Sequence, residues 1–98
     1  MRQVPQFSNS VVAGAASFDI DMDIGGQGAP GTVEVSVLSS LGCTWTISDS
    51  HDNLVWWIRD TILLGAAGQD SIAYDNTRRY VRIATPTVGN HTVHVSWI

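Results

Sequence analysis

At 98 residues the chain is long enough for one domain with a core of its own, and it leaves little for a second. Its formal net charge of −4 disfavours nucleic acid as the main partner, because phosphate binding needs a basic field. The single cysteine, Cys43, cannot form an internal disulfide, and no run of about 18 apolar residues predicts a membrane span. The first residues lack the apolar segment of a secretory leader, so we expect synthesis in a cytoplasm.

The positive charges are five arginines, without a single lysine. Lysine is the usual solvated surface residue, whereas arginine is favoured where a charge must sit in an interface. The composition therefore favours a protein that packs against neighbours, with compositional drift as the alternative.

The N-terminal region begins without a clear period. We expect residues 1–16 to form an arm that becomes an edge strand, and residues 17–98 to form the folded domain. Residues 17–24 alternate cleanly, with apolar side chains inward and three aspartates outward. Residues 25–31 are built from glycine and proline, so we expect a loop that is mobile or makes contacts.

Turn residues divide the middle of the chain into short segments of strand character. These segments are residues 32–38, 43–47, 54–59 and 71–74. Residues 60–64 are expected to continue extended or to form a short helical turn. The intervening turns are rich in glycine, serine, asparagine and aspartate, whose side chains bond their own backbone.

The end of the chain has the pattern of a β-hairpin. Two runs of alternating apolar and polar residues flank Pro86 and Gly89. In the second run Val93, Val95 and Trp97 share one face, which is expected to be buried.

These elements amount to seven or eight short strands without a convincing helical period. The pattern predicts an all-β domain that forms a single antiparallel β-sandwich, jelly-roll or immunoglobulin-like. An immunoglobulin domain proper is disfavoured, because one cysteine cannot supply its disulfide between the sheets.

The alternating aspartates Asp19, Asp21 and Asp23 resemble the opening of a calcium loop. Ile24 stands where that loop needs its glycine, and Pro30 where it needs its glutamate. On one face of a strand these carboxylates lie about 7 Å apart, too far to hold one ion without other ligands. A charged strand that resists edge-to-edge aggregation explains them better.

Neither a metal site nor an active site is expected. His91 and His94 are three residues apart on a strand, so they point to opposite faces, and His51 lies in another segment. Cys43 alternates with Trp45 and is expected in the core. No nucleophile motif or phosphate-binding loop appears in the sequence, so we expect no enzyme and no cofactor.

The adjacent tryptophans Trp56 and Trp57 cannot both enter one core, because neighbours on a strand face opposite ways. One of them is expected to be exposed or in an interface, where it could anchor a protein contact or stack on a sugar ring. The alternative is that a loop or the N-terminal arm covers it.

Several segments follow an order that resembles small β-sandwich virion proteins of tailed bacteriophages. The segments are residues 32–37, 43–47, 71–83 and 89–96. The hallmark of these modules is an Arg-Tyr-Val-Arg strand and a final Thr-Val-x-Val strand, here residues 79–83 and 92–95. The glycine that such modules carry before the middle strand is missing from residues 48–53. Residues 43–46 and 57–58 also resemble the BACON type of sugar-binding sandwich, which normally accompanies secreted enzymes.

The phage resemblance implies a structural protein of the virion, without enzymatic activity. It would bind the major capsid or tail proteins as a decoration, stabilising or adaptor subunit, as a homo-oligomer and with no membrane partner. The alternative is a carbohydrate-binding module that uses an exposed tryptophan to hold a glycan. The residues expected at the interface are Phe7, Trp56, Trp57, Arg78, Arg79, Tyr80 and Arg82.

Overall fold

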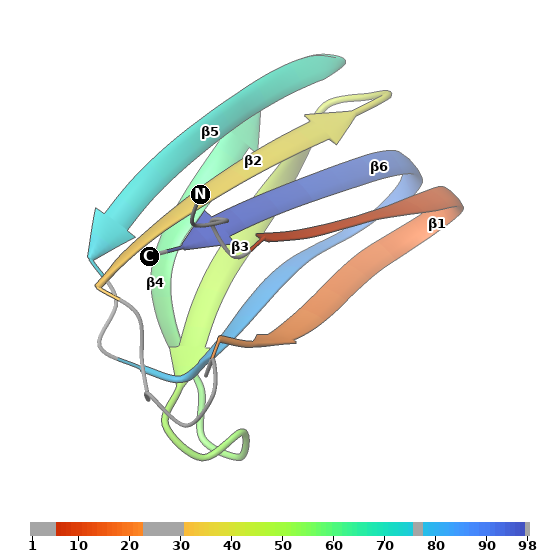
Figure 1. The fold of residues 1–98 in the computed structure, drawn as a ribbon. Coiled ribbons are helices and arrows are strands. Elements are labelled where there is room, and N and C mark those ends of the chain that lie inside the picture. Colours follow the sequence, from red (N-terminus) through yellow and green to blue (C-terminus); the bar gives the residue numbers. More distant parts are fainter. Residues whose placement is uncertain (1–5, 23–30, 76–77, 98) are drawn as a thin grey trace.

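The protein is all-β and antiparallel, as the sequence predicts. The structure, a computed structural model, describes residues 6–22, 31–75 and 78–97, so the expected loop at residues 25–31 lies outside it except for Gly31. Among the described residues, no helix is long and apolar enough to cross a membrane. The strands are β1 (Gln6–Asp21), β2 (Thr32–Ser39), β3 (Cys43–Ser50), β4 (Trp57–Leu64), β5 (Gly68–Asp75) and β6 (Tyr80–Trp97) (Figure 1).

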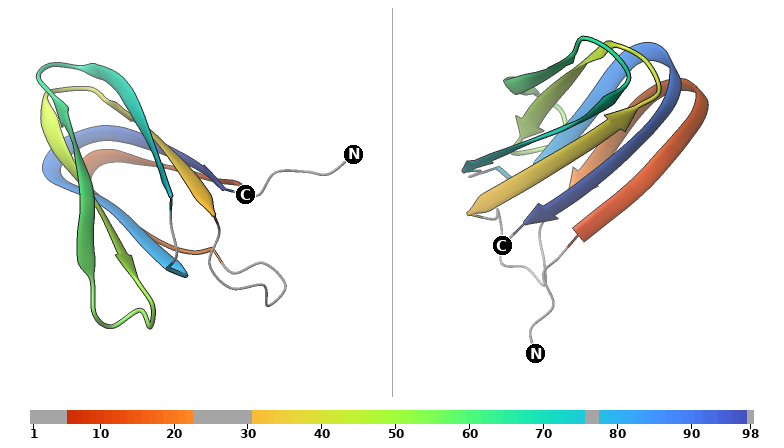
Figure 2. Two further views of the ribbon diagram at one scale, coloured as in Figure 1. Left: turned by 90° about the vertical axis from the view of Figure 1, so that its left-hand side faces the viewer. Right: turned by 90° about the horizontal axis from the view of Figure 1, so that it is seen from above.

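The six strands belong to one hydrogen-bonded sheet in the order β4-β3-β6-β2-β5, and β1 also pairs with β6. The sheet curls until its two ends, β4 and β5, approach each other, so that it is nearly closed into a barrel (Figure 2). The expected number of seven or eight strands was wrong, and the pairing does not show two separate facing sheets.

The expected closing hairpin was also wrong, because β6 is one continuous strand of 18 residues. Residues 80–84 pair with β3, whereas residues 91–97 pair with β2. Pro86 and Gly89 lie between these parts, where the pairing of β6 with β1 shifts its register. A proline is tolerated there because the ladder is already interrupted, and the chain bends instead of reversing.

β1 accompanies β6 along both of its parts. Residues 6–11 pair with the second part of β6, and residues 16–21 pair with the first. Register shifts on either side of Gly14, which pairs with Gly89, let the two strands bend together. The boundary expected after residue 16 therefore falls inside a strand that begins at Gln6.

The core consists of the strand residues that the alternation places inward. Those that the sequence predicts and the structure buries are Val33, Val35, Val37, Cys43, Trp45, Ile47, Val93, Val95 and Trp97. Burying one such aliphatic side chain stabilises the fold by about 1.5–3 kcal/mol. Ile20 and Met22 of the N-terminal alternation are buried too, whereas Phe18 is only half-buried and packs against the cluster.

One polar network lies inside this core. The buried His91 donates from Nε2 to the carbonyl of Thr87 (2.7 Å), so its Nδ1 accepts from the hydroxyl of Ser39 (2.8 Å). The Ser39 oxygen accepts in turn from the indole N–H of Trp45 (3.0 Å) and the thiol of Cys43 (3.3 Å). Each buried polar group of the network thus has a partner, which is the condition for placing it there.

Candidate functional site

The connection between β3 and β4 is a loop with its own hydrogen-bonded frame. The Ser50 hydroxyl oxygen accepts the backbone N–H groups of Asp52 (3.3 Å) and Asn53 (3.0 Å). Oδ1 of Asp52 accepts the N–H groups of Leu54 (2.9 Å) and Val55 (3.0 Å) and the Ser50 hydroxyl (3.0 Å). These bonds, those from Val55 and Leu54 first, hold the pKa of Asp52 below its usual value.

The loop and the start of β4 present four apolar side chains to solvent. Leu54 is 81% exposed, Ile58 71%, Val55 52% and Trp57 46%. We call these four residues the apolar tip. Scattered apolar residues are normal on a surface, but four of them within five residues, where a fixed loop meets a strand, indicate a binding surface.

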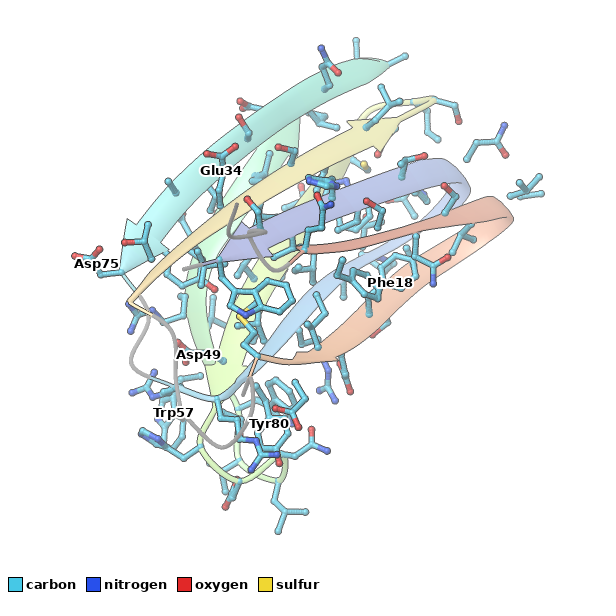
Figure 3. The ribbon with its side chains drawn as sticks, in the orientation of Figure 1. Phe18, Glu34, Asp49, Trp57, Asp75 and Tyr80 are labelled. Carbon is cyan, nitrogen blue, oxygen red and sulfur yellow. The ribbon has the colours of Figure 1, made fainter. Side chains whose placement is uncertain are left out.

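Two arginines border the apolar tip and share one buried carboxylate. Nη1 of Arg78 donates to Oδ1 of the fully buried Asp49 (2.5 Å), and Nε of Arg59 lies 3.4 Å from its Oδ2. The Arg78 guanidinium also lies over the Trp57 ring, 4.7 Å from its centroid. Nη2 of Arg59 donates to the carbonyl of Asp75 (2.8 Å), which ties β4 to β5. Figure 3 shows Asp49, Trp57 and Asp75 toward this end of the molecule.

Two further rings complete this end of the protein. The edge of His51 meets Trp57 with ring centroids 6.3 Å apart, and Nε of Arg78 donates to Nε2 of His51 (3.3 Å). Arg59 lies over the ring of Tyr74, 5.5 Å from its centroid. Burial and the charge of Asp49 raise the pKa of Tyr74, so its hydroxyl stays protonated at neutral pH.

Of the two adjacent tryptophans, Trp57 is the exposed one and Trp56 is half-buried. The guanidinium of Arg82 lies 4.0 Å from the Trp56 ring centroid and binds both carboxylate oxygens of Asp19 (2.7 and 2.9 Å). Trp56 is therefore covered by Arg82 of β6. The expected alternative was cover by a loop or by the N-terminal arm.

Of the remaining residues expected at an interface, Arg79 and Tyr80 lie together, and Phe7 lies apart from them. Arg79 binds both carboxylate oxygens of Asp21 (2.8 and 2.7 Å) and lies 5.1 Å from the ring centroid of Tyr80. Phe7 is half-buried against Phe18, with ring centroids 5.9 Å apart, and so belongs to the core margin. Among the described residues, no group of three or more histidines, cysteines or carboxylates could hold a metal ion.

A second surface lies where β1 and β6 bend. It is a groove of about 440 Å³ with apolar lining from Val11, Val12 and Leu38 and polar lining from Asn90 and Thr92. The groove and the apolar tip lie at opposite ends of β3, because this strand begins beside the groove and ends at the loop. Eight residues of strand separate them by about 25 Å.

The groove has an unusual backbone at its rim. Ala13 adopts a φ of 54°, a left-handed conformation that few residues other than glycine take up. Oδ1 of Asn90 accepts its N–H (2.9 Å) and so holds the bend of β1 against β6. The neighbouring Val12 is exposed, as is Val88 on β6.

Sequence reasoning expected Trp57 at an interface, which stays a prediction, but it did not single out the other three residues of the apolar tip. It assigned residues 54–59 to a strand, whereas β4 begins only at Trp57. The signal was present, because residues 54–58 are five consecutive apolar residues directly after a turn. Such a run cannot place all of its side chains in one core.

No protein-family model and no curated protein matches the chain. Solved structures of similar fold include the PBSX exported protein XepA, with a TM-score of 0.69 and 16% identity. That match covers 97% of this chain, which spans only 36% of XepA. The SPBc2 prophage-derived protein YomS matches with a TM-score of 0.67 and 7% identity, over 100% of this chain and 97% of YomS.

Carbohydrate-binding modules share the fold as well. The CBM32 of AlyQ, solved in complex with 4,5-unsaturated mannuronic acid, matches with a TM-score of 0.59 and 16% identity. The match covers 93% of this chain and 76% of that module. At such low sequence identities these matches show a common fold only. Function has to be argued from the residues of the site.

Proposed function

We propose that the protein is a non-enzymatic structural subunit of a bacteriophage particle, which acts there as an adaptor. The observation that carries the proposal is the presence of two exposed apolar surfaces at opposite ends of one rigid sheet, the groove and the apolar tip. A subunit with two such ends can join two partners. The fold that it shares with the prophage-derived YomS over nearly the whole of both chains supports the phage context.

In this proposal the groove is the end that faces the particle. Its neutral amide and hydroxyl groups beside exposed valines suit a capsid or tail protein surface, since protein interfaces combine an apolar centre with hydrogen-bonding groups. Symmetric attachment of several copies would multiply weak individual contacts by avidity.

The test is attachment to particles purified from the phage that encodes the chain. We expect the protein in those particles by mass spectrometry, and saturable binding of added protein to particles that lack it. Val12→Asp should abolish binding, whereas Leu63→Asp, a control at a 74% exposed position on β4, should not. Absence of the protein from purified particles would contradict the proposal.

A carbohydrate-binding module is the second candidate. It is favoured by the exposed ring of Trp57 beside His51, because a free aromatic ring can stack on a sugar. The fold shared with a sugar-binding CBM32 supports this candidate. Titration calorimetry with neutral and uronic-acid oligosaccharides tests it: binding that Trp57→Ala removes and Leu63→Ala leaves intact would favour the module over the particle subunit.

A further inference from the structure

We propose that the apolar tip inserts into a lipid surface, with Arg59 and Arg78 at the level of the lipid headgroups. This inference goes beyond the particle subunit and does not depend on it. It commits to a membrane surface as the occupant of the tip, and it leaves the groove at the opposite end free for another partner.

The first argument is the order in which side chains at this end are exposed. Among the large apolar side chains at this end, the aliphatic Leu54, Ile58 and Val55 are the most exposed, from 81% to 52%, and Trp57 follows at 46%. The side chains of Arg59 and Arg78 are 32% and 22% exposed. Aliphatic, aromatic and cationic groups follow one another in the same order from the hydrocarbon of a bilayer to its headgroups.

The second argument concerns the backbone of the loop. A segment that leaves water must satisfy its backbone N–H groups internally, because lipid offers no partner. The N–H groups of residues 52–55 are all bonded to side chains of the loop itself, those of Ser50 and Asp52. These N–H groups would therefore approach an apolar phase with their hydrogen bonds already formed.

The same frame limits the depth of insertion. The Asp52 carboxylate accepts three hydrogen bonds inside the loop. These bonds lower its pKa, so the group stays charged. A charged carboxylate does not enter hydrocarbon, so it stays among the headgroups while the tip side chains enter the interface.

The third argument is the charge around the tip. Guanidinium groups bind phosphate with paired hydrogen bonds, and both arginines are held in place, Arg78 over Trp57 and Arg59 over Tyr74. The chain as a whole carries −4, so an anionic lipid surface repels most of the molecule. Arg59 and Arg78 offset the charges of Asp49 and Asp52, so the excess negative charge lies away from this end, and approach with the tip foremost is the least repelled orientation.

The experiment uses the full chain and vesicles of phosphatidylcholine with and without phosphatidylglycerol. We expect the protein to float with the anionic vesicles in a density gradient. We also expect its tryptophan emission to shift to shorter wavelength and to be quenched by lipids brominated near the headgroup. Binding should weaken with added salt and on vesicles of phosphatidylcholine alone.

Variants then locate the contact. Leu54→Asp and Ile58→Asp should each lower vesicle affinity about tenfold or more, because each removes apolar area and adds a charge. Both positions are exposed, so the fold should persist, and circular dichroism checks this. Leu63→Asp is the matched control, at a 74% exposed position about 20 Å along β4 from Trp57, and should bind as the wild type does.

Each negative outcome is distinct. Wild-type protein that stays in the aqueous fraction with anionic vesicles overturns the inference, as does equal binding by the wild type and Leu54→Asp. If Leu54→Asp instead abolishes attachment to phage particles while the wild type ignores vesicles, the tip binds protein. In that case the lipid inference fails and the particle subunit stands.

Discussion

Arg78 and Asp49 form an ion pair at which three elements of the fold meet. From the connection between β5 and β6, Arg78 donates to the buried carboxylate of Asp49 on β3, and its guanidinium covers Trp57 at the start of β4. A buried carboxylate needs charged partners, and here the same partner also orients the exposed ring. This ion pair therefore contributes both to the stability of this end, together with the pair that Asp49 makes with Arg59, and to the position of Trp57 in the apolar tip.

We expect Asp49→Asn to lower the free energy of unfolding by about 1.5–3 kcal/mol, the usual contribution of hydrogen bonds to a charged group. Urea denaturation at neutral pH measures the loss. Asp70→Asn is the control, because the exposed side chain of Asp70 accepts the N–H of its neighbour Ser71, and it should change little. Equal losses in the two variants would show that the buried ion pair does not stabilise the fold.

Asp52 should contribute to the acid sensitivity of the protein. Its pKa is lowered in the folded state from an ordinary value of 3.8, so the stabilisation is present above that pH and is lost as the pH falls through the folded pKa. Asp52→Asn keeps an acceptor for Leu54 and Val55 but does not titrate. We expect the difference in Tm between wild type and variant to be largest at neutral pH and to shrink below pH 3.8. A difference that stays constant with pH would contradict the assignment.

Ser39→Ala should be strongly destabilising, because it removes the hydroxyl that bonds three buried groups, those of Trp45, His91 and Cys43. The indole N–H of Trp45 and Nδ1 of His91 both lose a hydrogen bond, and each unsatisfied group costs about 1–3 kcal/mol. Ser36→Ala is the control on the same strand, where the side chain points to the opposite face. Chemical denaturation of both variants measures their free energies of unfolding. An equally small loss in the two variants would show that the network does not stabilise the fold.

Gly89→Ala should be destabilising through overpacking. A Cβ at this position would overlap Cδ2 of Leu41 and lie 3.3 Å from the hydroxyl of Ser40. The cost should stay near or below about 1 kcal/mol, because Cδ2 is the end of a half-buried side chain that can turn away. In a Leu41→Ala background the same substitution should cost much less, and a double-mutant cycle measures the difference. If the losses of stability from Gly89→Ala and Leu41→Ala simply add, the contact with Leu41 is not the source of the strain.

The core of the fold could be predicted from local alternation, because inward positions such as Val35 and Trp45 depend only on the period of a strand. The topology could not. Pro86 and Gly89 have the local signature of a turn, but tertiary pairing with β1 and β2 keeps the chain extended through them. Whether a breaker reverses a strand or only bends it depends on which partners lie alongside, and these are far away in the sequence.

The candidate site was predictable only in part. An exposed tryptophan followed from the adjacency of Trp56 and Trp57, but adjacency alone could not say which one faces solvent. That choice depends on Arg82, which covers Trp56 from another strand. The role of Asp49 was hidden for the same reason, since its arginine partners come from β4 and from the connection after β5.

The central position of β6 has a consequence for biosynthesis. β1, β2 and β3 all pair with this strand, yet it follows every one of them in the sequence. As a ribosome releases the chain, the earlier strands leave the exit tunnel without the partner that completes their ladders, and non-local pairing is slow to form. During that interval their open edges can pair with other nascent chains. The yield of folded protein should therefore fall with the time that β1, β2 and β3 wait for residues 80–97.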